Sequence, residues 1–238
     1  MEKVKPRSLE EVMSLSFYFR HDEYIENVER SIAHHHEYIW SRAVQFDPSA
    51  SQKTFITNNY DPNDAYYLSD DALCILNQET IQTLYIDYFS NINRDSALII
   101  LIASFERHLK DICIALEAHD PNEIKLSLSD IKGDSSVIRA AKYLEKVIGI
   151  NAGRSSQQDC WKNVHNLFQI RHKIAHTGGS LNLDQPQVDW LKKNGYDAIQ
   201  EGFLIFTLKC INEYEQLLSD GIGEKYFKPA DEDLDPHA

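Results

Sequence analysis

The sequence of 238 residues has no long uninterrupted apolar run, only nine Gly and seven Pro, and no CxxC pair. A membrane-spanning helix needs about 18 consecutive apolar residues, so no transmembrane segment is expected. The opening residues, MEKVKPRSLEEVMSLSF, lack an apolar block behind their basic residues, which argues against a secretory signal. The four cysteines stand singly, at Cys74, Cys113, Cys160 and Cys210. This pattern argues against a disulfide framework or a cysteine zinc site and predicts reduced thiols in a cytoplasmic protein.

Positive charge is also scarce, and what there is lies in the middle of the chain. The net charge of −13 argues against indiscriminate binding to nucleic acid, which depends on Lys and Arg neutralising phosphates. Residues 100–176 nevertheless carry eleven Lys and Arg against nine Asp and Glu, whereas the rest of the chain carries thirteen against twenty-eight. The middle of the chain is therefore the part expected to face a phosphate.

Apolar residues recur at helical spacing along most of the chain, which predicts an all-α fold. Ser8 and Glu11 have the spacing of a capping box at the start of the first helix. Further helices are expected over residues 22–45, 62–78, 79–92, 96–119 (capped by Asp95 or Asn93), 135–148, 157–176 and 198–220. Loops are expected over residues 44–64 and around Pro186, with a short extended piece at 124–128.

This pattern predicts three regions. Residues 1–60 are expected to form an N-terminal helical extension, residues 61–222 the main helical bundle, and residues 223–238 an acidic C-terminal tail. The tail, which includes PADEDLDPHA, combines Pro with several carboxylates and is expected to be solvated. A role for the extension in docking to a control protein or to a dimer partner is a hypothesis.

One stretch, FQIRHKIAHTGG at residues 168–179, gathers an arginine, two histidines and a lysine at the end of a predicted helix. Its core side is expected to consist of Val164, Leu167, Phe168 and Ile174, and Gly178 and Gly179 are expected to end the helix. His172 and His176 are four positions apart and should share a face. Arg171 and His176 are five positions apart, which is about 140° of rotation on an ideal helix.

Arg171, His172 and His176 resemble the signature of the HEPN superfamily, an Arg followed by a polar residue and, four to six positions beyond the Arg, a His. The family usually has Asn in the second position, where this chain has His172. Many members also carry an acidic residue on an earlier long helix, and Glu106 in LIASFERHLKDI lies in a matching segment. The resemblance covers residues 62–222 and implies a HEPN-like helical bundle.

The resemblance implies a metal-independent endoribonuclease with no cofactor, in which two motifs face each other across the cleft of a homodimer. The residue types suit this chemistry independently. Histidine transfers protons near neutral pH, and the forked, permanently charged guanidinium of arginine suits phosphate. His176 is the expected general base or acid, Arg171 the phosphate clamp and His172 a positioning group or second proton carrier. Glu106 is expected to orient Arg171 or a histidine.

The family's biology implies a growth-arresting toxin or an anti-phage defence effector that acts on RNA, with a cognate regulator or antitoxin protein as a possible partner. A non-catalytic HEPN-like module that binds nucleotide, RNA or a partner protein is the alternative from another functional class.

Simpler interpretations of individual residues stay open. Cations near the end of a helix complement its dipole without any catalytic role. His172 and His176 have zinc-ligand spacing, but the glutamate that zinc hydrolases place after the first His is missing. Residues 34–37, HHHE, look metal-like, yet neighbouring helical positions are about 100° apart. We expect a surface face there, with His35 turned toward apolar neighbours. A tyrosine cluster, Tyr60, Tyr66 and Tyr67, favours loop packing over base stacking.

Overall fold

The computed structural model describes residues 8–14, 17–43, 87–120, 123–133, 135–177 and 183–227. All regular structure within these ranges is helical, and no strand occurs in them, so the predicted all-α class is confirmed. The elements are α1 (Leu9–Ser14), α2 (Phe17–Ala43), α5 (Tyr88–His119), the short 3₁₀ turn η3 (Leu128–Asp130), α6 (Ser136–Tyr143), the π-helical turn η4 (Leu144–Ile148), α7 (Asp159–Thr177), α8 (Gln185–Lys193) and α9 (Phe203–Tyr226). In the described ranges, no helix is both long enough and apolar enough to cross a bilayer.

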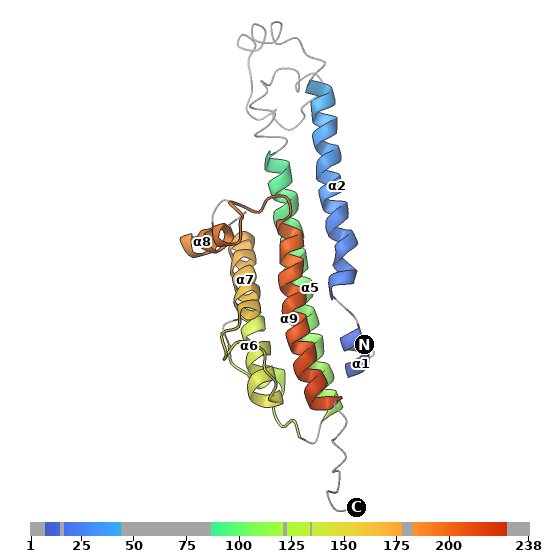
Figure 1. The fold of residues 1–238 in the computed structure, drawn as a ribbon, viewed down its shortest axis with the longest axis vertical. Coiled ribbons are helices and arrows are strands. Elements are labelled where there is room, and N and C mark those ends of the chain that lie inside the picture. The colour runs from blue at the N-terminus through green and yellow to red at the C-terminus, as the bar shows by residue number, and fades with distance from the viewer. Residues whose placement is uncertain are drawn as a thin grey trace, which may run out of the picture.

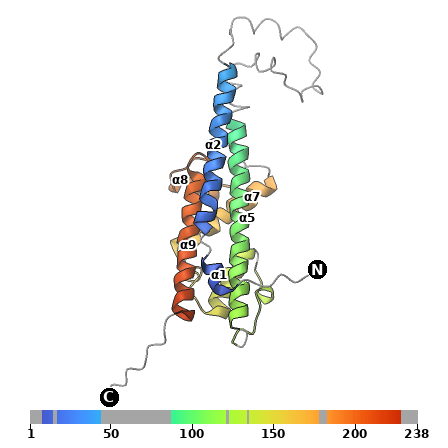
Figure 2. The ribbon, with the colours of Figure 1, turned by 90° about the vertical axis from the view of Figure 1, so that its right-hand side faces the viewer.

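Four long helices, α2, α5, α7 and α9, form the body of the molecule, and successive members run in opposite directions (Figure 1). α5 and α9 lie at the centre. α2 packs over the seam between them, as Figure 2 shows, and α7 packs against both from the other side. α6 continues the line of α7 toward the lower end of the bundle and lies against α5. α5 therefore contacts α1, α2, α6, α7 and α9 and is the central element of the fold.

Among the described helices, α5 contributes the most apolar residues to the core, followed by α9. Leu98, Leu101, Ile102 and Phe105 are fully buried within two turns. These residues share one face of α5, whereas Ile100 on another face is 49% exposed, so the helix is not buried all round. A polar group also lies in this buried region: His108 is 2.8 Å from Glu215 of α9 through Nε2 and Oε1.

The N-terminal helices pack on this core. The predicted capping box of α1 is confirmed: the Glu11 backbone N–H donates to Ser8 Oγ at 3.1 Å, and the Ser8 N–H donates to Glu11 Oε2 at 2.8 Å. On α2, Ile25 and Ile32 are buried against α5 and α9. His35 is stacked on Phe89 of α5 with ring centroids 3.7 Å apart, which confirms the expected apolar neighbour of this histidine.

A partly buried ion pair links α2 to α5. Arg94 donates to Glu29 through two nitrogens, at 3.0 Å to Oε1 and 2.7 Å to Oε2, and the two side chains are 11% and 24% exposed. Removing one partner of such a pair leaves the other charge in a poorly solvated place. Glu29→Gln should therefore lower the free energy of unfolding by about 1–3 kcal/mol.

Thermal unfolding measures this effect, and a fall in Tm of about 2–12 °C is expected, at about 2–4 °C for each kcal/mol in a chain of this size. The matched control is Glu26→Gln on the same helix. Glu26 lies 4.0 Å from Arg30, and both side chains are more than 60% exposed, at 62% and 63%. An exposed pair contributes about 0–1 kcal/mol, so the control should melt close to the wild type. Equal Tm values for the two variants would contradict this account of the Arg94 pair.

Some predicted helix boundaries are wrong. α5 does not begin at Asn93 or Asp95 but already at Tyr88, because Asn93 Nδ2 donates to the Phe89 carbonyl at 2.7 Å inside the helix and Arg94 is bound to α2. Residues 124–128 form no strand, since Ser127 instead caps the η3 turn. Pro186 does not lie in a loop; it occupies the first turn of α8, where a missing backbone N–H costs nothing. α9 spans Phe203–Tyr226 rather than 198–220.

Several predictions concern residues outside the described ranges. They are the helix at 62–78, most of that at 79–92, the loop at 44–64, the tyrosine cluster, Cys74, the Gly178–Gly179 helix ending and the tail beyond residue 227. The boundary between the expected extension and the main bundle also lies there. The other three cysteines are free thiols, and burial raises the pKa of Cys210 to about 12, with a smaller contribution from Glu213.

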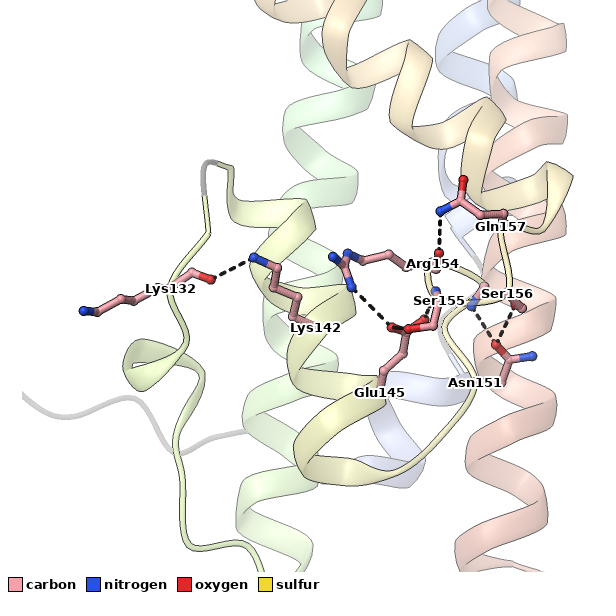
Figure 3. Close-up of polar contacts among 9 residues, drawn as sticks. Lys132, Lys142, Glu145, Asn151, Arg154, Ser155, Ser156 and Gln157 are labelled. Carbon is pink, nitrogen blue, oxygen red and sulfur yellow. Dashed lines mark hydrogen bonds and ion pairs between the residues drawn. The ribbon is translucent and has the colours of Figure 1, made fainter.

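A tightly bonded loop precedes α7 and fixes where this helix starts. The side chain of Glu145, on η4, accepts from the Ser155 backbone N–H at 2.8 Å and from Ser155 Oγ at 2.5 Å, and it lies 3.7 Å from Arg154 (Figure 3). Asn151 accepts from the Gly153 N–H at 2.9 Å. At the end of η4, Lys225 of α9 donates to the carbonyl of Ile148. The loop is thus held by contacts from η4 and from α9. These contacts fix the position along α5 at which α7 begins.

Candidate functional site

The predicted motif lies on the last two turns of α7, and its helix has the expected apolar core side. Val164, Leu167, Phe168 and Ile174 are all at most 6% exposed. The motif residues project from the remaining faces, where Arg171 is partly exposed and His172 and His176 are exposed. Because the core side is fully packed, changes to the motif side chains do not create a cavity in the bundle.

Arg171 and Glu106, which are 65 positions apart in the sequence, lie together where α7 meets α5. Arg171 Nη2 lies 3.7 Å from Glu106 Oε2, and these side chains are 27% and 22% exposed. The second oxygen of Glu106 accepts a hydrogen bond from Ser136 Oγ, at the start of α6, at 2.8 Å. Glu106 thus joins three helices, and the carboxylate is held from two sides.

The guanidinium of Arg171 keeps unused donor capacity. Its separation of 3.7 Å from Glu106 is an electrostatic contact rather than a hydrogen bond, for which distances up to about 3.2 Å are usual. Its Nε atom is buried and has no hydrogen-bond partner among the residues that the structure describes. Nε itself is closed to a ligand, but the Arg171 side chain is 27% exposed, and its accessible guanidinium nitrogens are suited to an anion such as a phosphate.

His172 and His176 form a second pair on the neighbouring face of α7. Their ring centroids are 4.4 Å apart and the rings are tilted by 57°. Two imidazoles at this distance can reach adjacent atoms of one substrate, one ring accepting a proton and the other donating one. The shared face that the i, i+4 spacing predicts is therefore observed.

The two pairs are not joined to each other within one chain. In the described part of the structure, the contacts of Glu106 are with Arg171 and Ser136, whereas His172 and His176 contact each other. The rotation of about 140° between Arg171 and His176 explains this, because Arg171 turns toward α5 while the histidines turn outward. A single chain thus presents two half-sets of side chains on adjacent surfaces: Glu106 with Arg171, and His172 with His176.

His165 extends the histidine face by two further turns and is a neighbour that motif reasoning missed. It stacks on Trp161 with ring centroids 5.6 Å apart, and Gln169 Nε2 lies 3.5 Å from His165 Nε2. Burial lowers the pKa of His165, so this ring is held neutral at physiological pH. His165, Gln169, His172 and His176 follow the i, i+4, i+7, i+11 spacing of one helix face. This spacing could have indicated from the sequence that His165 lies beside the motif.

No cluster of three or more His, Cys, Asp or Glu side chains suited to a metal ion occurs among the described residues. His172 and His176 lie close to each other, but the described structure brings no third ligand to them.

Comparisons of this chain with protein-family models, with curated proteins and with solved structures each gave no match.

Proposed function

We propose that this chain is a metal-independent endoribonuclease of the HEPN type, acting in the cytoplasm as a toxin or anti-phage effector. The observation that carries the proposal is the contact between Glu106 of α5 and Arg171 of α7, beside the exposed pair His172 and His176. A partly exposed arginine and two histidines within reach of each other suit RNA cleavage by its own 2′-hydroxyl.

In the proposed reaction, the 2′-oxygen attacks the adjacent phosphorus and the bond from phosphorus to the 5′-oxygen breaks. One histidine, His176 in our assignment, takes the proton of the 2′-hydroxyl. The second histidine, His172, gives a proton to the departing 5′-oxygen. Arg171 stabilises the charge that grows on the phosphoryl oxygens, and Glu106 holds Arg171 in place. The products are a 2′,3′-cyclic phosphate and a 5′-hydroxyl end.

A homodimer is part of the proposal because Arg171 and His176 face different directions in one chain. Two copies related by a two-fold axis could place their motifs on opposite sides of one cleft, so that both His176 side chains and both Arg171 side chains line the same site. The same divergence favours a second candidate function, a non-catalytic module that binds RNA, a nucleotide or a regulator or antitoxin protein. In that case the two half-sets would serve as separate contact points.

The test is incubation of the purified protein with total RNA in EDTA, comparing wild type, His176→Ala and His34→Ala. The wild type should cleave in EDTA and leave 2′,3′-cyclic phosphate ends, and His176→Ala should lose about 100-fold or more of the rate. His34, on α2, is 73% exposed and paired with Glu37, so its variant serves as the matched control and should cleave like the wild type. Strict dependence on Mg²⁺ with 5′-phosphate ends would contradict the mechanism. Absence of cleavage by folded wild type under all conditions would favour the binding module.

A further inference from the structure

A pocket opens between α5, α6 and the connector that precedes α6, next to the Glu106–Arg171 contact. It has a volume of about 560 Å³, within the range of about 300–1,000 Å³ usual for small-molecule sites. Its lining comprises Glu106, Arg107, Lys110, Ile114 and Glu117 of α5, Ser127, Leu128 and Ser129 of the connector, and Ser136, Arg139 and Ala140 of α6. The α5 positions follow helical spacing, so one face of this helix forms the floor.

Three cations line this pocket. Arg107, Lys110 and Arg139 make no hydrogen bond or ion pair with any part of the chain that the structure describes. Elsewhere in the same region cations are engaged: Arg154 contacts Glu145, Lys162 contacts Asp159. The lining holds these three cations and two carboxylates, Glu106 and Glu117, so its charge is positive by one in a chain of net charge −13.

The two carboxylates of the pocket are already engaged. Glu106 is held by Ser136 and Arg171. Glu117 accepts from the Leu128 backbone N–H at 2.6 Å, which fastens the connector to α5. The carboxylates therefore shape the pocket, and the cations remain available to a ligand.

The position of Arg139 is fixed by a glycine. A Cβ atom built on Gly133 would lie 2.6 Å from Cγ of Arg139, so only glycine leaves room for the arginine chain at this place. Arg139 therefore lies against the connector at the rim of the pocket. α6 also begins here, and the positive end of its dipole adds to the attraction for an anion.

From these features we infer that the pocket binds the phosphate of a nucleotide, with Arg107, Lys110 and Arg139 as its contacts and the apolar Ile114, Leu128 and Ala140 facing the base or sugar. The inference rests on the proposed function in one respect: Glu106 belongs both to this pocket and to the candidate site. A strand cleaved at Arg171 can thus continue along α5 into the pocket. The two sources of such a phosphate are an RNA strand and a free nucleotide.

The experiment measures binding rather than cleavage. A 2′-O-methyl oligoribonucleotide, which has no 2′-hydroxyl to attack, and adenosine monophosphate are titrated separately into the full chain by fluorescence anisotropy and calorimetry. The variant combines Arg107→Gln, Lys110→Gln and Arg139→Gln. We expect the oligonucleotide to bind about tenfold or more weakly to it, and the slope of log affinity against log salt to fall by about two, near 0.7 for each lost phosphate contact.

Two controls distinguish binding at the pocket from a general effect of positive charge on the protein surface. The triple variant Lys146→Gln, Lys192→Gln and Lys209→Gln removes the same charge from exposed lysines outside the pocket and should bind like the wild type. Gly133→Ala keeps every charge but displaces Arg139, and it should weaken binding by a smaller factor. Thermal melting of each variant checks that it is folded.

The outcomes distinguish this inference from the proposed function. Equal losses in the pocket and control triple variants, or wild-type affinity in the pocket variant, would overturn the inference and leave the cleavage proposal untouched. Binding of adenosine monophosphate but not of the oligonucleotide would support the phosphate pocket and count against RNA cleavage. Binding of the oligonucleotide through the pocket cations supports both.

Discussion

Replacing Arg171 by alanine should reduce RNA cleavage by about 100- to 1,000-fold without unfolding the bundle. This is the effect of removing one donor that stabilises the developing charge of a transition state. The core side of α7 does not depend on Arg171, since Val164, Leu167 and Ile174 are buried independently of it. The measurement is the single-turnover cleavage rate of a defined RNA, with the Tm of each variant as the check on folding.

Arg171→Lys should recover little of the rate. Lysine keeps the positive charge but offers a single ammonium group in place of the fork that can donate two parallel hydrogen bonds to a phosphate. A lysine variant with near wild-type activity would show that only charge matters, and the proposed clamp would be wrong.

The matched control is Arg154→Ala. Arg154 also lies 3.7 Å from a carboxylate, that of Glu145, and its side chain is 30% exposed, against 27% for Arg171. The two arginines thus differ in location, while their pairing and exposure are alike. Loss of cleavage in both variants would point to a general effect of removing arginine, whereas loss in Arg171→Ala alone supports a specific role.

The sequence was sufficient for the parts of the fold that depend on local patterns. The apolar period along α7 predicted its core side, and the Ser8–Glu11 spacing predicted a capping box that is present with both hydrogen bonds. The start of α5 was not predictable in this way. Asn93 and Asp95 look like caps, but packing on α2 and the bond from Arg94 to Glu29 continue the helix through them. Tertiary contacts outweighed a local signal.

In the candidate site, too, some contacts could be predicted from local patterns in the sequence and others could not. The shared face of His172 and His176 follows from helix geometry and could be stated in advance. The bond from Ser136 to Glu106 spans 30 positions, and no sequence period reveals such a contact. The unpaired cations of the pocket were visible only as the positive balance of residues 100–176. Which of the eleven basic residues remain unpaired depends on where the connector and α6 settle against α5.

Mixing His176→Ala with wild-type subunits should lower cleavage far more than dilution alone. In the proposed dimer the two motifs face each other across one cleft, so both His176 side chains belong to one site, and a dimer with one His176→Ala subunit lacks half of that site. If mixed dimers are inactive, activity follows the square of the wild-type fraction. With about one wild-type subunit in ten, about 1% of the activity should remain, against about 10% for independent subunits.

The measurement is the cleavage rate across a series of mixing ratios, after subunit exchange, at constant total protein. Mixing wild type with Arg154→Ala, which is expected to be active, is the control and should leave the rate unchanged at every ratio. A quadratic decline for His176→Ala supports a site shared between two copies. A linear decline would show that one intact His176 is enough for a site, and the cleft shared by both copies of His176 would be wrong.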